Sequence, residues 1–306
     1  MRLGTQGASV CAIALAVAAS ACGGEGGDDD EAPDQVVPVR FGELLTRLPA
    51  RERSAIALDV AGARHELGLP PGAAPPAPTA QGSDGARRLR GLTAATVLNY
   101  PIKDDGPLDR AIDPGQVSAL ARVDGPPEVL LIATRQPWDA LRGALERQGW
   151  HERRDRVLER PAGRALRWVA GRDGLAVAAG DPRVAPAVLE GREHTAPALR
   201  ALLAAAPGPA RAARLTGSRC VRGFAAGYSP AAAGGRFLLS VADVPPRAYR
   251  LKAVRGRTLP DGYATQTPRS AGGRVEVPFT LEASTDPSVQ PAALALGSSP
   301  YFDYSC

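Results

Sequence analysis

The chain contains few residues whose type and spacing could support catalysis. Its only lysines are Lys103 and Lys252. A Walker A loop needs a glycine directly before its lysine, so that backbone amides can surround a phosphate, and neither lysine has one. A nucleophile elbow, G-x-S-x-G, needs a second glycine two residues after its serine, but Ala231 stands there after Ser229. The chain therefore carries neither of these phosphate-binding or acyl-transfer motifs.

Possible metal ligands are also dispersed. The three histidines, His65, His151 and His194, lie far apart, and none belongs to an H-E-x-x-H helix. The segment Asp104-Asp105-Gly106 starts like a calcium loop. Its glycine comes too early for the alternating D-x-D-x-D-G geometry, which favours a simple acidic turn. We therefore predict no catalytic residue, no cofactor and no metal ligand.

The strongest signal in the sequence lies at the amino terminus. Arg2 is followed by an uncharged, mostly apolar stretch over residues 8–19, which would rise only about 18 Å as a helix. The hydrocarbon core of a bilayer is about 30 Å thick, so an export signal over residues 1–21 fits better than a transmembrane helix.

The segment Ala19-Ser20-Ala21-Cys22 resembles a bacterial lipobox. The resemblance implies that a diacylglyceryl group is attached to the sulfur of Cys22 and that the chain is cleaved just before it. Ala19 stands where leucine is commonest, and the same residues fit the A-x-A rule of ordinary secretion, which would leave a free thiol. Residues 22–39 include GGEGGDDDEAPDQ, the flexible acidic composition of a tether. The part after the tether is similar to uncharacterised exported lipoproteins of GC-rich bacteria.

Charge and composition argue against nucleic-acid binding. The chain has 37 basic and 32 acidic side chains and a formal net charge of +5. All basic residues except two are arginine, which indicates biased coding more than a selected basic surface. Because the arginines are scattered among almost as many acids, we predict no nucleic-acid partner.

One group of arginines is denser than the others. It comprises Arg153, Arg154, Arg156, Arg160, Arg164 and Arg167. The group could face anionic lipid headgroups or an acidic cell-wall polymer, although Glu152, Asp155 and Glu159 are interleaved with it. The alternative is a salt-bridged strand edge that discourages pairing with another sheet. The sequence leaves both interpretations open.

Hydrophobic periodicity predicts an α+β fold with mainly antiparallel sheets and packed helices. Helices are expected over residues 40–48, 61–69, 86–98, 113–123 and 137–149 and from residue 181, and strands over 54–60, 128–134, 156–159, 165–170 and 175–179. Further strands are expected over 236–242, 262–267 and 274–281, with helices over 245–254 and 286–294. A strand, a proline-led helix, more strands and an Asp-Pro-led helix follow in this order from about 128 and again from about 236. The order suggests a duplicated βαββα unit.

These elements divide the chain into five parts. They are a signal peptide (1–21), a tether (22–39), a mainly helical portion (40–127) with a Pro/Gly/Ala-rich loop at 70–85, a first α+β unit (128–215) and a second α+β unit (216–306).

The sequence thus predicts an exported lipoprotein on the outer face of the cell membrane. The lipid on Cys22 would bind the membrane, and the folded part would bind an unknown envelope protein or polymer without catalysis. Two alternatives remain. One is a hydrolase whose site forms only in three dimensions from carboxylates such as Asp59, Asp104 and Asp173. The other is a structural spacer.

Cysteine use leads to a first testable prediction. Cys11 is removed with the signal and Cys22 would carry the lipid, which leaves Cys220 and Cys306 in an oxidising compartment. We predict that they form a disulfide closing a loop of about 87 residues, worth at most roughly 4–5 kcal/mol in the chain-entropy model. A non-reducing tryptic digest should contain the two cysteines in one linked peptide pair. Two separate, alkylatable peptides would show that the bond does not exist.

Overall fold

A computed structural model describes residues 36–73, 82–97, 107–123, 128–154, 156–160, 166–216, 221–241, 263–265, 269–271 and 274–281. They belong to one compact unit that begins at Val36. The helices are α1 (Phe41–Leu44), α2 (Val60–Glu66), α3 (Asp84–Val97), α4 (Pro107–Ala111), α5 (Trp138–Glu146), α6 (Val184–Leu189) and α7 (Pro197–Ala205). The strands are β1 (Ser54–Asp59), β2 (Val117–Val123), β3 (Val129–Thr134), β4 (His151–Arg154), β5 (Val157–Glu159), β6 (Trp168–Arg172), β7 (Leu175–Ala179), β8 (Ala210–Leu215), β9 (Val221–Ser229), β10 (Gly234–Val241), β11 (Tyr263–Thr265), β12 (Arg269–Ala271) and β13 (Arg274–Leu281).

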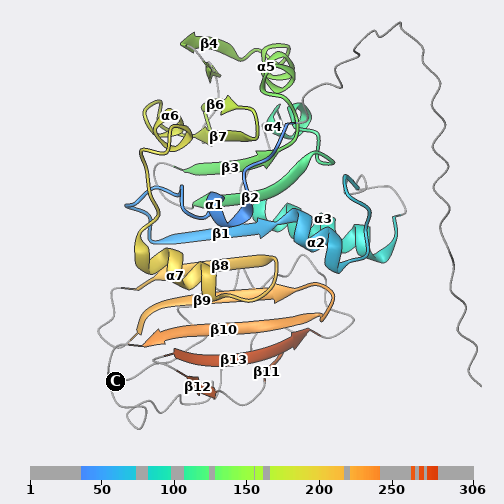
Figure 1. Cartoon of the computed structure of the whole chain (residues 1–306), viewed down its shortest axis with the longest axis vertical. Helices are drawn as coiled ribbons and strands as arrows, with labels where there is room; N and C mark the ends of the chain where they lie inside the picture. Colours follow the sequence, from blue (N-terminus) through green and yellow to red (C-terminus); the bar gives the residue numbers. More distant parts are fainter. Residues whose placement is uncertain are drawn as a thin grey trace, which may run out of the picture. The chain divides into compact units, whose positions relative to one another are not determined.

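All the described strands form a single sheet in the order β11-β13-β10-β9-β8-β1-β2-β3-β7-β6-β5-β4, with β12 paired to β13 (Figure 1). Each strand pair is antiparallel. Strand β1 lies in the middle of this order and pairs with β2 on one side and β8 on the other. The α+β prediction with antiparallel pairing is therefore confirmed.

The sheet has a similar arrangement of strands on the two sides of the β1–β8 pair. Outward from β1 come β2, β3 and then β7, and outward from β8 come β9, β10 and then β13. The repeat starts expected near residues 128 and 236 fall on β3 and β10, each the second strand outward from the β1–β8 pair. The duplication of a βαββα unit stays a prediction. The division into units at residues 128 and 216 stays a prediction, and the helices expected over 245–254 and 286–294 lie outside the described residues.

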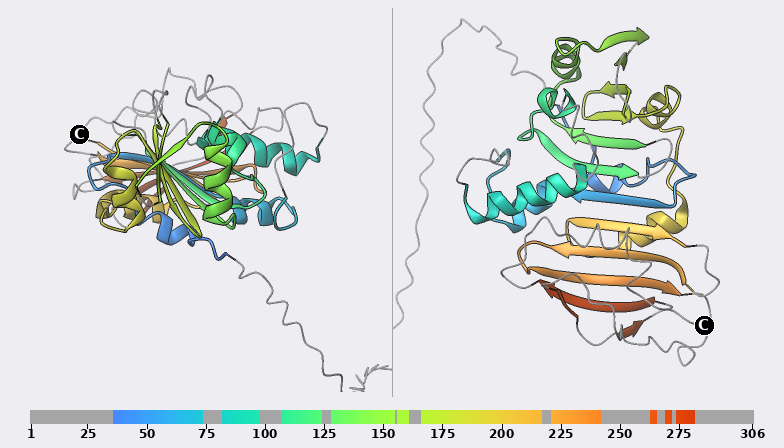
Figure 2. Two further views of the ribbon diagram at one scale, coloured as in Figure 1. Left: turned by 90° about the horizontal axis from the view of Figure 1, so that it is seen from above. Right: turned by 180° about the vertical axis from the view of Figure 1, so that it is seen from behind.

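Helices cover both faces of the sheet (Figure 2). Helices α2, α3, α4 and α5 contribute to the core on one face, where the central strands present large side chains such as Leu58, Leu120 and Ile132. Helices α1, α6 and α7 contribute to the core on the other face, where the central strands present alanines such as Ala57 and Ala121. None of the helices in the described ranges is long and apolar enough to cross a bilayer.

The helix expected over residues 113–123 is wrong, because β2 occupies Val117–Val123. The Asp113-Pro114 pair begins a turn instead of a helix. The Asp113 carboxylate accepts a hydrogen bond from the Gly115 N–H at 2.8 Å, and the Asp113 carbonyl accepts one from the Gln116 N–H at 3.0 Å. This local bonding competes with a helical start, and pairing with β1 and β3 then fixes the extended strand.

The first described residues already contact the folded body. The Val39 N–H donates to the Gly174 carbonyl, in the β6–β7 turn, at 3.1 Å. Gly174 has a φ of +84°, and a side chain there would collide with the Val37 carbonyl oxygen, so this close approach requires glycine. Val39 packs against the core on the α1 side. The expected tether over 22–39 therefore reaches the body before its last residue.

Candidate functional site

The three residues for which the sequence predicts a modification all lie outside the described residues. They are Cys22, the predicted lipidation site, and the predicted disulfide pair Cys220 and Cys306. All three assignments stay predictions.

The carboxylates considered for a hydrolase do not converge. Asp59 ends β1, and its Oδ1 accepts the Gly62 N–H at 2.9 Å, which caps α2. Asp173 lies in the β6–β7 turn, and its Oδ1 accepts the Trp138 N–H at 2.8 Å, at the first residue of α5. Asp104 lies outside the described residues. Both described carboxylates therefore satisfy backbone donors at helix starts, which is a structural role.

The histidines stay apart as well. His65 lies on α2, His151 begins β4 and His194 lies between α6 and α7. Within the described ranges, no group of three or more His, Cys, Asp or Glu side chains could hold a metal ion.

One hydroxyl–carboxylate pair does exist, and no sequence motif marked it. Ser229, the last residue of β9, donates from Oγ to Glu66 Oε2 on α2 at 2.6 Å. A carboxylate in this position can act as a base toward a hydroxyl. The Ser229 Oγ also accepts the Ala232 N–H at 3.4 Å, within the β9–β10 turn. The pair thus joins α2 to this turn.

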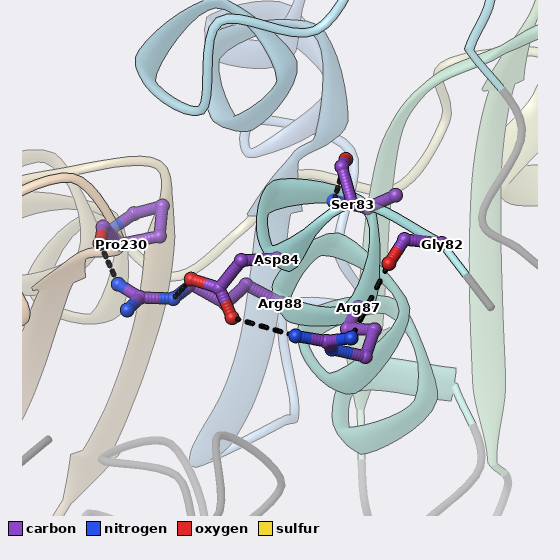
Figure 3. A network of polar contacts seen from close by, with 7 residues as sticks. Gly82, Ser83, Asp84, Arg87, Arg88 and Pro230 are labelled. Atoms are coloured by element: carbon purple, nitrogen blue, oxygen red, sulfur yellow. Dashed lines mark hydrogen bonds and ion pairs between the residues drawn. The ribbon is translucent and has the colours of Figure 1, made fainter.

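A second contact joins α3 to the same turn. Asp84 pairs with Arg88 Nε at 2.9 Å and with Arg87 Nη2 at 3.4 Å (Figure 3). Arg88 Nη1 donates to the Pro230 carbonyl at 3.1 Å. Burial raises the pKa of the nearby Tyr228, Arg88 lowers it and Glu66 raises it further. The Ser229–Glu66 and Arg88–Pro230 contacts thus fix α2 and α3 to the β9–β10 hairpin.

The buried Arg64 has a similar role. Its guanidinium donates to the carbonyls of Ala73, Pro114 and Val117 at 2.9, 2.7 and 2.6 Å. Burial lowers its pKa and so does nearby Arg135, whereas Asp113 raises it. The three bonds hold the turn before β2 against α2. The Pro-Gly-Ala segment after α2 is held by the same side chain.

In the dense arginine group, Arg153 and Arg154 lie on β4, and Arg156, Arg160 and Arg167 lie next to the ends of β5 and β6. Glu159 is buried and accepts Arg153 Nε at 2.5 Å and Arg167 Nη2 at 2.7 Å. Burial alone would raise the pKa of Glu159, but the hydrogen bonds and charges of these two arginines hold it below the ordinary value. Arg154 donates to the Pro182 carbonyl at 3.0 Å, and Arg164 lies outside the described residues. These contacts favour the salt-bridged strand edge over a lipid or polymer site.

Comparison with known proteins gives a structural similarity only. No protein-family model matches the chain, and no curated protein matches it. The chain is similar to TP0453 in crystal form I (TM-score 0.46, 9% identity) and in crystal form III (TM-score 0.39, 10% identity). In both comparisons the match covers 86% of this chain and 99% of TP0453. At scores and identities this low, the similarity carries no conclusion about function.

The Glu159 contacts predict a pH-dependent stability. Its folded pKa is lowered, so the carboxylate stabilises the fold above the unfolded value of about 4.3, and this stabilisation is lost as the pH falls through the folded pKa. Glu159→Gln should lower Tm at pH 7, and the difference from the parent chain should shrink below about pH 4. Thermal unfolding followed by circular dichroism measures both.

The matched control is Glu190→Gln, which removes an exposed carboxylate paired with Arg192 at 2.7 Å. This exposed pair should change Tm little. An unchanged Tm for Glu159→Gln at pH 7, or a difference that widens on acidification, would contradict the role given to Glu159.

Proposed function

We propose that this chain is a lipid-anchored protein of the cell envelope whose folded part binds a partner without chemical turnover. The anchor is the diacylglyceryl group on Cys22. The signal peptide over 1–21 directs export and is removed, and the residues after Cys22 connect the anchor to the folded body.

One observation carries this proposal. Only 13 residues lie between Cys22 and Val36, where the compact unit begins. A flexible chain of this length has an r.m.s. end-to-end distance of about 20 Å and a maximum reach of about 50 Å. An anchor at Cys22 therefore keeps the body within a few nanometres of the membrane.

The side-chain contacts support binding over hydrolysis. Asp59 and Asp173 already accept backbone hydrogen bonds at helix starts, and Glu66 and Ser229 join a helix to a turn. A catalytic carboxylate must instead reach a substrate and move a proton. These groups have the contacts of structural residues.

Lipidation at Cys22 is tested by following the mature amino terminus. We expect the expressed chain to partition into the detergent phase and its first peptide to begin at Cys22 with a diacylglyceryl mass, because two acyl chains give stable membrane binding. Cys22→Ala should move the protein to the aqueous phase. Mass spectrometry and detergent partitioning measure both outcomes.

The matched control is Cys11→Ala, which changes a cysteine inside the predicted signal and should leave anchoring unchanged. A water-soluble product that carries an unmodified Cys22 thiol would contradict the proposal and would indicate ordinary secretion.

A further inference from the structure

We infer that the surface formed by Val37, Arg40, Arg135 and Arg172 contacts the anionic lipid headgroups of the membrane that holds the anchor. We call it the tether-proximal surface. The inference rests on the proposed function, since the anchor brings this surface to the bilayer.

Backbone contacts bring these residues together from three segments. The Gly174 carbonyl accepts the Val39 N–H at 3.1 Å and the Thr134 N–H at 3.4 Å. Arg40 follows Val39 and Arg135 follows Thr134, while Arg172 ends β6 two residues before Gly174. The residues before Arg40 and Arg135 thus bond to the same carbonyl group, and Arg172 lies two residues before it in the sequence.

The three arginine side chains have no partner within the described part of the chain. All three are exposed, and their side chains make no hydrogen bond or ion pair with any other residue that the structure describes. The adjacent acid Asp173 accepts the Trp138 N–H on α5, and Glu43 of α1 pairs with Arg47 at 2.5 Å. Both carboxylates stay charged, but neither forms an ion pair with one of the three arginines.

Val37 distinguishes a lipid surface from other anions. It is 81% exposed and is the large hydrophobic side chain that stands out to solvent among the described residues. An apolar side chain beside several arginines suits the boundary between headgroups and acyl chains, where basic groups meet phosphate and apolar groups leave water. Burial of Val37 would contribute less to the binding of a soluble acidic partner.

The acidic tether is the rival occupant of this surface. Its carboxylates are Glu25, Asp28, Asp29, Asp30, Glu31 and Asp34. They have the opposite charge to the arginines, but they offer nothing apolar to Val37, and an anionic bilayer repels them. We therefore assign the surface to lipid, and the experiment below separates the two occupants.

The test uses the full mature chain with Cys22→Ser, so that no lipid contributes to binding. Its partition is measured by co-sedimentation with vesicles of phosphatidylcholine alone and with vesicles that also contain phosphatidylglycerol. The chain should bind only the anionic vesicles, and added salt should weaken the binding. The triple variant R40Q/R135Q/R172Q should bind roughly 100-fold more weakly, because each basic residue near an anionic surface contributes about fivefold.

The matched control is R147Q/R200Q/R222Q, which removes the same charge from exposed positions on other elements. It should bind within a few-fold of the parent chain, and circular dichroism should show that both triple variants are folded. Equal losses in the two variants would overturn the assignment, as would an absence of binding to anionic vesicles.

A third variant replaces the six tether carboxylates by their amides. If binding to anionic vesicles appears only in this variant, the tether occupies the surface and the inference fails. None of these results depends on lipidation. Whether Cys22 carries the anchor is determined separately, by analysis of the mature amino terminus.

Discussion

The antiparallel pairing of β1 with β8 is the constraint on which the rest of the fold depends. It aligns Ser54 with Arg214 and Leu58 with Ala210, and it is the link between the two halves of the sheet. Both strands are buried on both faces along most of this pairing. A break here would expose the centre of both cores. The pairing therefore also determines where α1, α2 and α7 can pack.

Side-chain size then determines how the helices approach each face. Alanines of the central strands let Leu44 of α1, Leu48 in the segment after α1 and Leu202 of α7 come close to the sheet. On the opposite face, larger strand residues meet α2, α3 and α5, where Trp138 lies directly over Gly171. The same packing of β6 and β7 holds the turn at Asp173 and Gly174. This turn fixes the start of the body and, with it, the tether-proximal surface.

The sequence predicted the elements whose patterns are local. Strand β3, helix α5 and the β6–β7 hairpin have clear periodicity and clear turn residues. It did not predict β8 or β9, because Ala-rich segments such as 210–215 suit a helix or a strand equally and only pairing with β1 decides. It also missed β2, where the Asp113 turn resembles a helix start. The tether-proximal surface could not be predicted from the sequence, since only the bonds of Val39 and Thr134 to the Gly174 carbonyl bring the segments of its arginines together.

Native-state hydrogen exchange tests most directly whether the β1–β8 pair unites the protein. If it does, the amides of both strands exchange only through global unfolding, with equal protection, and thermal unfolding is a single transition. The contradicting result is exchange in β8, β9 and β10 at a much lower opening free energy than in β1, β2 and β3. The halves would then open independently, and the β1–β8 pair would not be the constraint that the structure indicates.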